Sequence, residues 1–198
     1  MKTTILILSM LLVIITSCNQ DQEETYTPTL PPITQTGANT FGCKINGQIM
    51  VPRDSKKDPL MGGYPYGVEY GGNRFLNDNY DWIEAKDQVS DNNRGAIVFK
   101  LPNINTLGVG EYIIKHVDGA FSVANPNIVY MGAISKNGFY SSIEGTGKIT
   151  ITRYDEDIIS GTFYCTLKND YDPPNDIIEV TEGRFDFNKN TINTTKFP

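Results

Sequence analysis

Apolar side chains recur at every second position in several runs after residue 40, which is the pattern of half-buried β-strands. In the run 158–167, Ile159 and Phe163 fall on one face, whereas Ser160 and Thr162 fall on the other. Further strand candidates lie at 95–101, 111–117, 127–134, 148–152 and 177–187. A chain with this period can bury its apolar faces only by packing sheets together.

Turn signals separate these runs at the short intervals typical of all-β domains. Dipeptides of Gly, Asn, Asp or Pro lie at 46–47, 71–72, 118–119, 137–138 and 173–174. Only 78–95 is expected to hold a short helix. We therefore predict an all-β fold, an antiparallel β-sandwich or, as the alternative, a partly closed β-barrel. The apolar parity changes near Gly183, which predicts a β-bulge.

The N-terminus reads as a leader. Lys2 precedes an apolar run of eleven residues, 5–15. This run is too short for a membrane span, which takes about 20 residues, and has the length of a signal-peptide core. The sequence "ITSC", ending at Cys18, resembles a bacterial lipobox. We expect residues 1–17 to be a cleaved lipoprotein signal peptide and Cys18 to carry the lipid.

Residues 18–39 are polar and rich in Thr and Pro, which predicts a flexible tether before a single domain at 40–198. Two or three acyl chains on one residue anchor a protein stably, so the expected partner is a membrane. The acidic cluster at 21–24 resembles the export signals of surface lipoproteins in Bacteroidota. The sequence thus predicts an outer-membrane lipoprotein of the cell envelope, on the surface or the periplasmic face.

The formal net charge is −6, and the acidic residues are interspersed with Lys and Arg. The sequence has no basic stripe of the kind that binds phosphates. Nucleic acid is therefore not expected as a partner.

Three segments resemble a known group of proteins. They are "LPPITQTGANTFGCKINGQ" (30–48), "ISGTFYCTLKN" (159–169) and "VTEGRFDF" (180–187). Together they look like an uncharacterised family of Bacteroidota lipoproteins with a domain of unknown function. The resemblance implies a lipoprotein with a β-rich fold, and it brings no activity, cofactor or catalytic residue.

The two cysteines left in the mature domain have two interpretations. Cys43 and Cys165 both lie on the apolar faces of their expected strands. A disulfide between them would close a loop of about 120 residues and contribute about 4–5 kcal/mol on the chain-entropy estimate. The alternative, which we favour, is a pair of reduced core thiols, because buried free cysteine packs as a small hydrophobe.

Residues that could carry catalysis are few. His116 is the only histidine, so zinc binding or a histidine-dependent nucleophile has little support. Carboxylates are plentiful, and a glycan hydrolase needs two of them. Asp170, Asp172 and Asp176 lie in a Pro-broken loop that is a weak calcium candidate, since it lacks the EF-hand order. No cofactor is expected.

The segment 61–73 combines glycines with tyrosines, and a tryptophan follows it. Aromatic loops on β scaffolds bind ligands through stacking and apolar contact. We therefore expect that any binding site includes Tyr64, Tyr66 and Trp82. The sequence predicts a lipid-anchored envelope protein without enzymatic activity. The alternatives are a surface module that binds glycans or peptides and, less favoured, a carboxylate-dependent glycan hydrolase.

Overall fold

The protein was analysed as a computed structural model, which describes residues 26–55, 65–72, 80–89, 95–116, 127–135, 137–171 and 176–198. Its strands are β1 (Thr40–Ile45), β2 (Gln48–Met50), β3 (Val68–Gly72), β4 (Tyr80–Asp87), β5 (Gly95–Pro102), β6 (Gly110–Ile113), β7 (Tyr130–Ser135), β8 (Gly138–Ser142), β9 (Lys148–Tyr154), β10 (Ile158–Asn169) and β11 (Ile177–Asn188). Two single turns of helix accompany them, α2 (Ile104–Leu107) and η3 (Ile192–Thr194).

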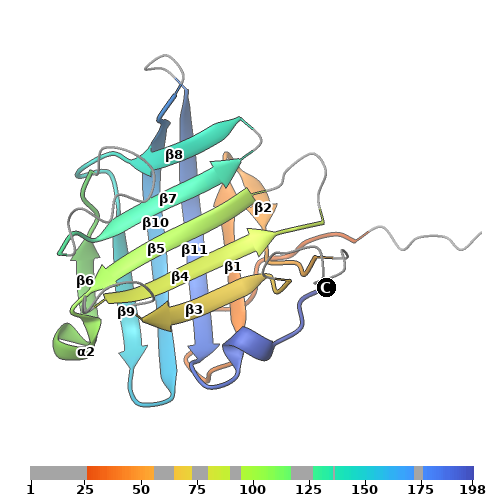
Figure 1. The fold of residues 1–198 in the computed structure, drawn as a ribbon, viewed down its shortest axis with the longest axis vertical. Helices are drawn as coiled ribbons and strands as arrows, with labels where there is room; N and C mark the ends of the chain where they lie inside the picture. Colours follow the sequence, from red (N-terminus) through yellow and green to blue (C-terminus); the bar gives the residue numbers. More distant parts are fainter. Residues whose placement is uncertain are drawn as a thin grey trace, which may run out of the picture.

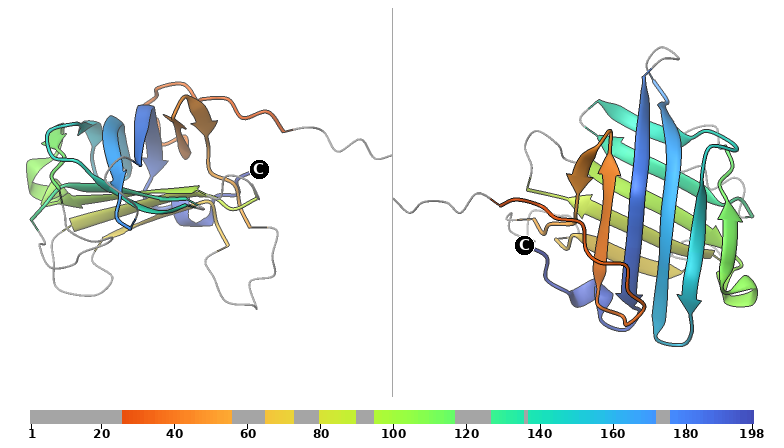
Figure 2. Two further views of the ribbon diagram at one scale, coloured as in Figure 1. Left: turned by 90° about the horizontal axis from the view of Figure 1, so that it is seen from above. Right: turned by 180° about the vertical axis from the view of Figure 1, so that it is seen from behind.

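All the strands belong to one antiparallel sheet in the order β2-β1-β11-β10-β8-β7-β5-β4-β3, with β9 and β6 continuing from β10. The sheet curls strongly, so that β1, β11, β10 and β9 form a first layer across which β8, β7, β5, β4 and β3 run as a second (Figures 1 and 2). The predicted all-β, antiparallel fold is confirmed, and its form is that of a half-barrel.

β10 makes the corner between the two layers. Its first part, Ile159–Tyr164, pairs with β9, and its last part, Leu167–Asn169, pairs with β8. The backbone ladder is therefore continuous around this side of the half-barrel. We call it the closed side.

Phenylalanines from both layers fill the space between them. Phe99 of the second layer meets Phe163 of the first edge to face, with ring centroids 4.5 Å apart, and Phe41 lies 5.4 Å from Phe163. Phe185 and Phe187 extend the cluster at 5.5 Å from each other. All five rings are buried, so aromatic contacts across the layers hold the fold together.

The β-bulge predicted near Gly183 is present. Gly183 pairs with Phe163 and Val180 pairs with Cys165, so two residues of β11 face one residue of β10. The extra residue lies at Glu182, whose φ of 50° is left-handed. This insertion keeps both ends of β11 directed into the core despite the change of parity.

Two expectations about local structure are wrong. The helix expected within 78–95 is absent from the described residues there, where 80–87 form β4. Ile83 and Ala85 alternate with Trp82 and Glu84, and this period, together with the aromatic and β-branched residues, favours a strand. The strand expected at 111–117 ends at Ile113 as β6.

The last part of the expected tether belongs to the folded domain. The carboxylate of Asp186 accepts hydrogen bonds from the Thr34 hydroxyl at 2.7 Å and from the amides of Thr36 and Gly37 at 2.9 and 2.8 Å. The expectation of a flexible segment up to 39 is therefore wrong for 34–38. A polar Thr/Gly run reads as a loop, but here its donors satisfy a buried carboxylate.

The expected signal peptide and Cys18 lie outside the described residues. Within the described part of the chain, neither helical turn is long or apolar enough to cross a membrane.

Candidate functional site

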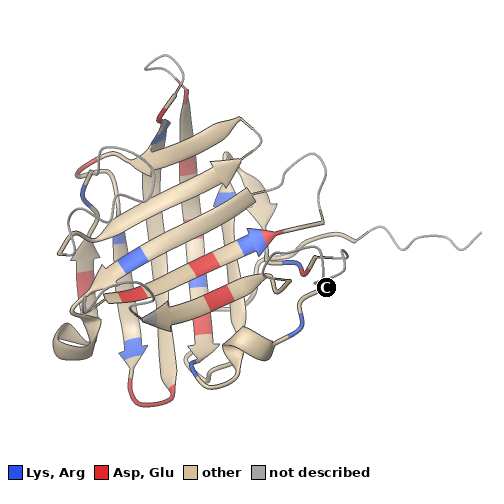
Figure 3. Cartoon of the chain, viewed as in Figure 1, with Lys and Arg blue, Asp and Glu red and all other residues tan. Residues whose placement is uncertain are grey.

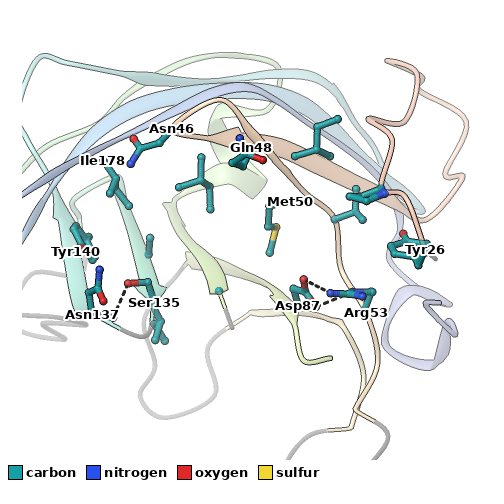
Figure 4. A pocket seen from close by; sticks show the side chains of 17 residues that line it. Tyr26, Asn46, Gln48, Met50, Arg53, Asp87, Ser135, Asn137, Tyr140 and Ile178 are labelled. Atoms are coloured by element: carbon teal, nitrogen blue, oxygen red, sulfur yellow. Dashed lines mark hydrogen bonds and ion pairs between the residues drawn. The ribbon is translucent and has the colours of Figure 1, made fainter. Parts of the chain in front are cut away.

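A cavity of about 520 Å³ lies between the β1–β2 hairpin and the second layer (Figure 4). Its upper wall is the β1–β2 hairpin, and the ends of β4, β5 and β7 bound it below. We call this the open side. The lining residues are Tyr26, Pro28, Ile45, Asn46, Gln48, Ile49, Met50, Val51, Arg53, Asp87, Gly95, Ala133, Ile134, Ser135, Asn137, Tyr140 and Ile178.

The Asn46-Gly47 turn sets the upper wall. Both residues have positive φ, 48° and 79°, as in the two-residue turn that matches the twist of a hairpin. The turn is fixed to β11, because the Asn46 amide donates to the Glu179 carbonyl and the Asn46 side chain accepts from the Glu179 amide. The Met50 side chain of the adjoining β2 points into the cavity (Figure 4).

The interior of the cavity is mostly apolar. Met50, Ala133 and Ile178 supply aliphatic surface, and Ile45 is partly buried beside them. The ring of Tyr140 also lines the wall, but its hydroxyl donates to Asp176 at 2.7 Å. The polar end of this tyrosine is thereby satisfied, which leaves its ring as an apolar surface.

The charged groups at the rim neutralise one another. The Arg53 guanidinium makes a bidentate pair with Asp87, through Nε at 2.8 Å and Nη2 at 2.7 Å. The ring of Tyr26 lies over the guanidinium, 5.2 Å from its carbon. No other charged side chain from the described residues lines the cavity, so its wall carries no net charge.

Uncharged polar groups complete the wall. The side chains of Gln48 and Asn137 line it from opposite sides. Ser135 lies beside Asn137, and the backbone amide of Asn137 donates a hydrogen bond to the Ser135 Oγ. Carboxamides can both donate and accept hydrogen bonds. The site can therefore hold a ligand with an apolar body and neutral polar groups.

The predicted aromatic site is not assembled by the described residues. Tyr64 lies outside them. Tyr66 is partly buried, with the Lys196 ammonium 4.9 Å from its ring, and Trp82 is a partly buried residue of β4. Neither ring is mostly exposed, and neither lines the cavity, so these two residues provide no exposed stacking platform.

Cys43 and Cys165 are both unbonded and buried, as the core-thiol interpretation expects. Burial raises the pKa of Cys43 to about 12, although the charge of Arg184 opposes the rise. Burial likewise raises the pKa of Cys165 to about 11 against hydrogen bonds that lower it. Neither thiol is therefore a nucleophile near neutral pH.

The expected calcium candidates are used internally or lie outside the described residues. Asp170 accepts a hydrogen bond from Ser141 at 2.9 Å, and Asp176 accepts from Tyr140 and Asn169. Asp172 lies outside the described residues, among which no acidic cluster suited to a metal ion was found.

His116 lies after β6, where its Nδ1 is 2.9 Å from the Ser142 carbonyl oxygen, and it does not line the cavity. Asp87 is the one carboxylate contributed to the cavity by the described residues. A glycan hydrolase requires a second carboxylate about 5–9.5 Å from the first. The cavity wall that the structure describes does not supply this pair.

A buried polar cluster surrounds Asp81, which does not line the cavity. The carboxylate accepts from the Tyr70 hydroxyl at 2.6 Å, and the Tyr154 hydroxyl lies 3.5 Å away. The pKa of Asp81 is raised, because the effect of burial outweighs these hydrogen bonds and the charge of Lys189, which lower it. Since Tyr70 and Asp81 belong to the second layer and Tyr154 to the first, the cluster ties the layers together.

Sequence reasoning recognised the Asn46-Gly47 turn but not the cavity. The wall combines the hairpin with residues 133–135, Asn137, Tyr140 and Ile178, which are far apart in the chain. No local pattern marks such a site, because its residues are ordinary strand and turn residues.

No family model, no curated protein and no solved structure matched this chain in comparisons with known proteins. The resemblance to Bacteroidota lipoproteins therefore stays a prediction, and the function has to be argued from the geometry.

Proposed function

We propose that this protein is a lipid-anchored binding protein of the cell envelope that holds a neutral ligand with an apolar body. The observation that carries the proposal is the cavity of about 520 Å³ on the open side. This volume falls within the range of about 300–1,000 Å³ that small-molecule and cofactor sites occupy.

The chemistry of the wall supports binding rather than catalysis. Arg53 and Asp87 are paired with each other, so neither is poised to act on a ligand. The remaining polar groups are carboxamides and hydroxyls, which recognise amides or alcohols. A strongly charged ligand would lose hydration there without gaining a partner charge.

The predicted anchor is consistent with a site close to the membrane. Cys18 precedes Tyr26, a residue of the cavity rim, by eight residues. Even a fully extended chain of this length spans only about 30 Å. If Cys18 is acylated, the rim cannot move further than this from the lipid surface.

A neutral fluorescent probe, N-phenyl-1-naphthylamine, tests whether the cavity binds. We expect the wild type to enhance its fluorescence saturably and Ala133→Leu, which fills the cavity, to weaken binding about tenfold or more. Asn105→Leu is the control, since it adds the same side chain on exposed α2 at the far end of the molecule (Figure 1). Equal binding by all three proteins, each with a normal melting curve, would falsify the proposed cavity function.

The anchor is tested separately by expressing the full chain and Cys18→Ala and partitioning both with detergent. We expect only the wild type to enter the detergent phase. Recovery of both proteins in the aqueous phase would reject lipidation without affecting the result on the cavity.

A further inference from the structure

The outer edge of β2 is open beside the cavity. β2 ends the sheet, and no described strand pairs with it beyond β1. In a hairpin with a two-residue turn, the residues that flank the turn, here Ile45 and Gln48, exchange hydrogen bonds with each other. The next pair, Lys44 and Ile49, does not, so its amides and carbonyls point away from each other. The amide and carbonyl of Ile49 therefore point outward from the edge.

The same edge already pairs with another strand a few residues later. The Arg53 amide donates to the Lys86 carbonyl at 3.0 Å, and the Arg53 carbonyl accepts from the Gln88 amide at 3.2 Å. Arg53 forms this parallel bridge with Asp87 at the end of β4. The chain from β2 to Arg53 thus presents outward hydrogen-bonding groups that bond to β4 at Arg53 and to no described backbone group at Ile49.

The cavity extends to both faces of this edge. Gln48 and Met50 line it from the face that also carries Cys43 in the core. Ile49 and Val51, which alternate with them, line it as well, near Pro28. An added strand alternates its side chains between two faces, so one face would enter the apolar interior and the other would lie against Ile49 and Val51.

We propose that the ligand is an extended, uncharged peptide segment that adds a strand to β2 and places an apolar side chain in the cavity. This inference rests on the proposed function and specifies its ligand. Main-chain hydrogen bonds to Ile49 supply affinity in this mode, and the side-chain pocket supplies specificity. The neutral wall, with carboxamides at Gln48 and Asn137, suits the peptide's amides rather than its charged side chains.

A proline substitution separates strand addition from cavity binding. Ile49→Pro removes the outward amide but no hydrogen bond of the β1–β2 hairpin, and proline is tolerated on edges where the amide would face solvent. Ile49→Ala is the matched control, because it shortens the side chain and keeps the amide. The probe is a set of capped, fluorescein-labelled heptapeptides that alternate threonine and valine around a central Gly, Ala, Leu or Met, followed by fluorescence anisotropy.

We expect the wild type to bind the peptide with central Leu about tenfold more tightly than the one with central Gly, since only Leu fills the apolar interior. Ile49→Pro should bind every peptide about tenfold more weakly than Ile49→Ala, whereas the two variants should bind N-phenyl-1-naphthylamine alike, because both shorten the same residue of the cavity wall. Peptide should also slow hydrogen exchange of the Ile49 amide in the wild type, which tests the edge without a substitution.

Equal peptide binding by Ile49→Pro and Ile49→Ala, or unchanged exchange at Ile49, would overturn strand addition. Probe binding without peptide binding would overturn it and leave the cavity function standing, whereas loss of both would overturn both. If the wild type is a dimer by size-exclusion chromatography and Ile49→Pro is a monomer, a second copy occupies the edge, and the peptide proposal is wrong.

Discussion

The two sides of the half-barrel are closed by different kinds of interaction. On the closed side, β10 passes from the first layer to the second within one continuous backbone ladder. On the open side, β2 has three residues, and the layers are joined by the short bridge between Arg53 and Asp87. Backbone pairing brings the core side chains into contact on the closed side. On the open side, the bridge at Arg53 and the hydrogen bond from the Ser55 amide to the Pro65 carbonyl span the gap and leave a cavity beside them.

The two sides also differ in the surroundings of their carboxylates. The Asp186 carboxylate in the first layer is 1% exposed and accepts five hydrogen bonds from the segment 34–38 and one from Ser160. Asp87 on the open side is more accessible and is paired mainly with one arginine. Elsewhere, acidic and basic residues are interspersed over the strands (Figure 3). A fully satisfied buried carboxylate specifies one arrangement, while a rim pair leaves room for movement.

The largest expected difference is between the two aspartates. Asp186→Ala leaves several buried donors without an acceptor and should lower the free energy of unfolding by about 3–5 kcal/mol. Asp87→Ala removes one partly exposed ion pair and should cost about 1 kcal/mol. Urea unfolding of both variants measures the difference, and similar losses would contradict the distinction between the two sides.

Two methionines provide a matched comparison of packing. Met131 faces Phe99 on β5 and is fully buried, whereas Met50 is 6% exposed and lines the cavity. Met131→Ala should destabilise by about 2–5 kcal/mol, and Met50→Ala by at most about 2 kcal/mol, since fewer contacts are lost beside an existing cavity. Thermal and urea unfolding of the two variants measure these costs. A larger loss for Met50→Ala would show that the open side is packed as tightly as the core.

The stability of the first layer should depend on pH through Asp186. Burial by itself raises the pKa of Asp186, but the hydrogen bonds from Thr34, Ser160, Thr36 and Gly37 outweigh it and hold the pKa well below its usual range. A depressed folded-state pKa stabilises the protein fully above the unfolded value of about 4, and this contribution is lost as pH falls through the folded value.

We therefore expect the free energy of unfolding to fall more steeply below about pH 4 in the wild type than in Asp186→Asn, which cannot titrate there. Urea unfolding between pH 2 and pH 6 measures both slopes. Parallel slopes would show that Asp186 titrates alike in the folded and unfolded states. The comparison with the isosteric amide removes the contributions of the other carboxyl groups.

The features that could be predicted from sequence are those that depend on the local pattern of neighbouring residues. The alternation in 158–167 specifies β10, the change of parity specifies the bulge at Glu182, and the apolar faces place Cys43 and Cys165 in the core. Where local composition misleads, the prediction is wrong. Asp- and Asn-rich sequence around β4 hides the alternation of Ile83 and Ala85.

The site could not be predicted because it depends on how the sheet closes. Thr36 bonds to Asp186 across 150 residues, and the hairpin meets the end of β7 only after the sheet has curled. Nothing in the sequence near Met50 indicates that the second layer leaves a cavity beside this residue instead of packing against it. The aromatic residues drew attention because of their unusual local composition, whereas the cavity is made of ordinary residues.

The smallest effect concerns the two thiols, which report local opening on each side. Cys43 lies under β2, where it pairs with Met50, and Cys165 lies in β10 between β11 and the corner strands. Both are buried with raised pKa values, so labelling at pH 8 requires the local structure to open. Opening of a three-residue edge strand disrupts fewer hydrogen bonds than opening of β10.

Iodoacetamide should therefore label Cys43 severalfold faster than Cys165 in the folded protein, as measured by peptide mass spectrometry. Both cysteines should react readily in urea, and this control also tests for a disulfide, which would leave both unlabelled. Equal rates for the two residues in the folded state would mean that β2 is held as firmly as the closed side. In that case an incoming peptide would meet a rigid edge that does not open locally before binding.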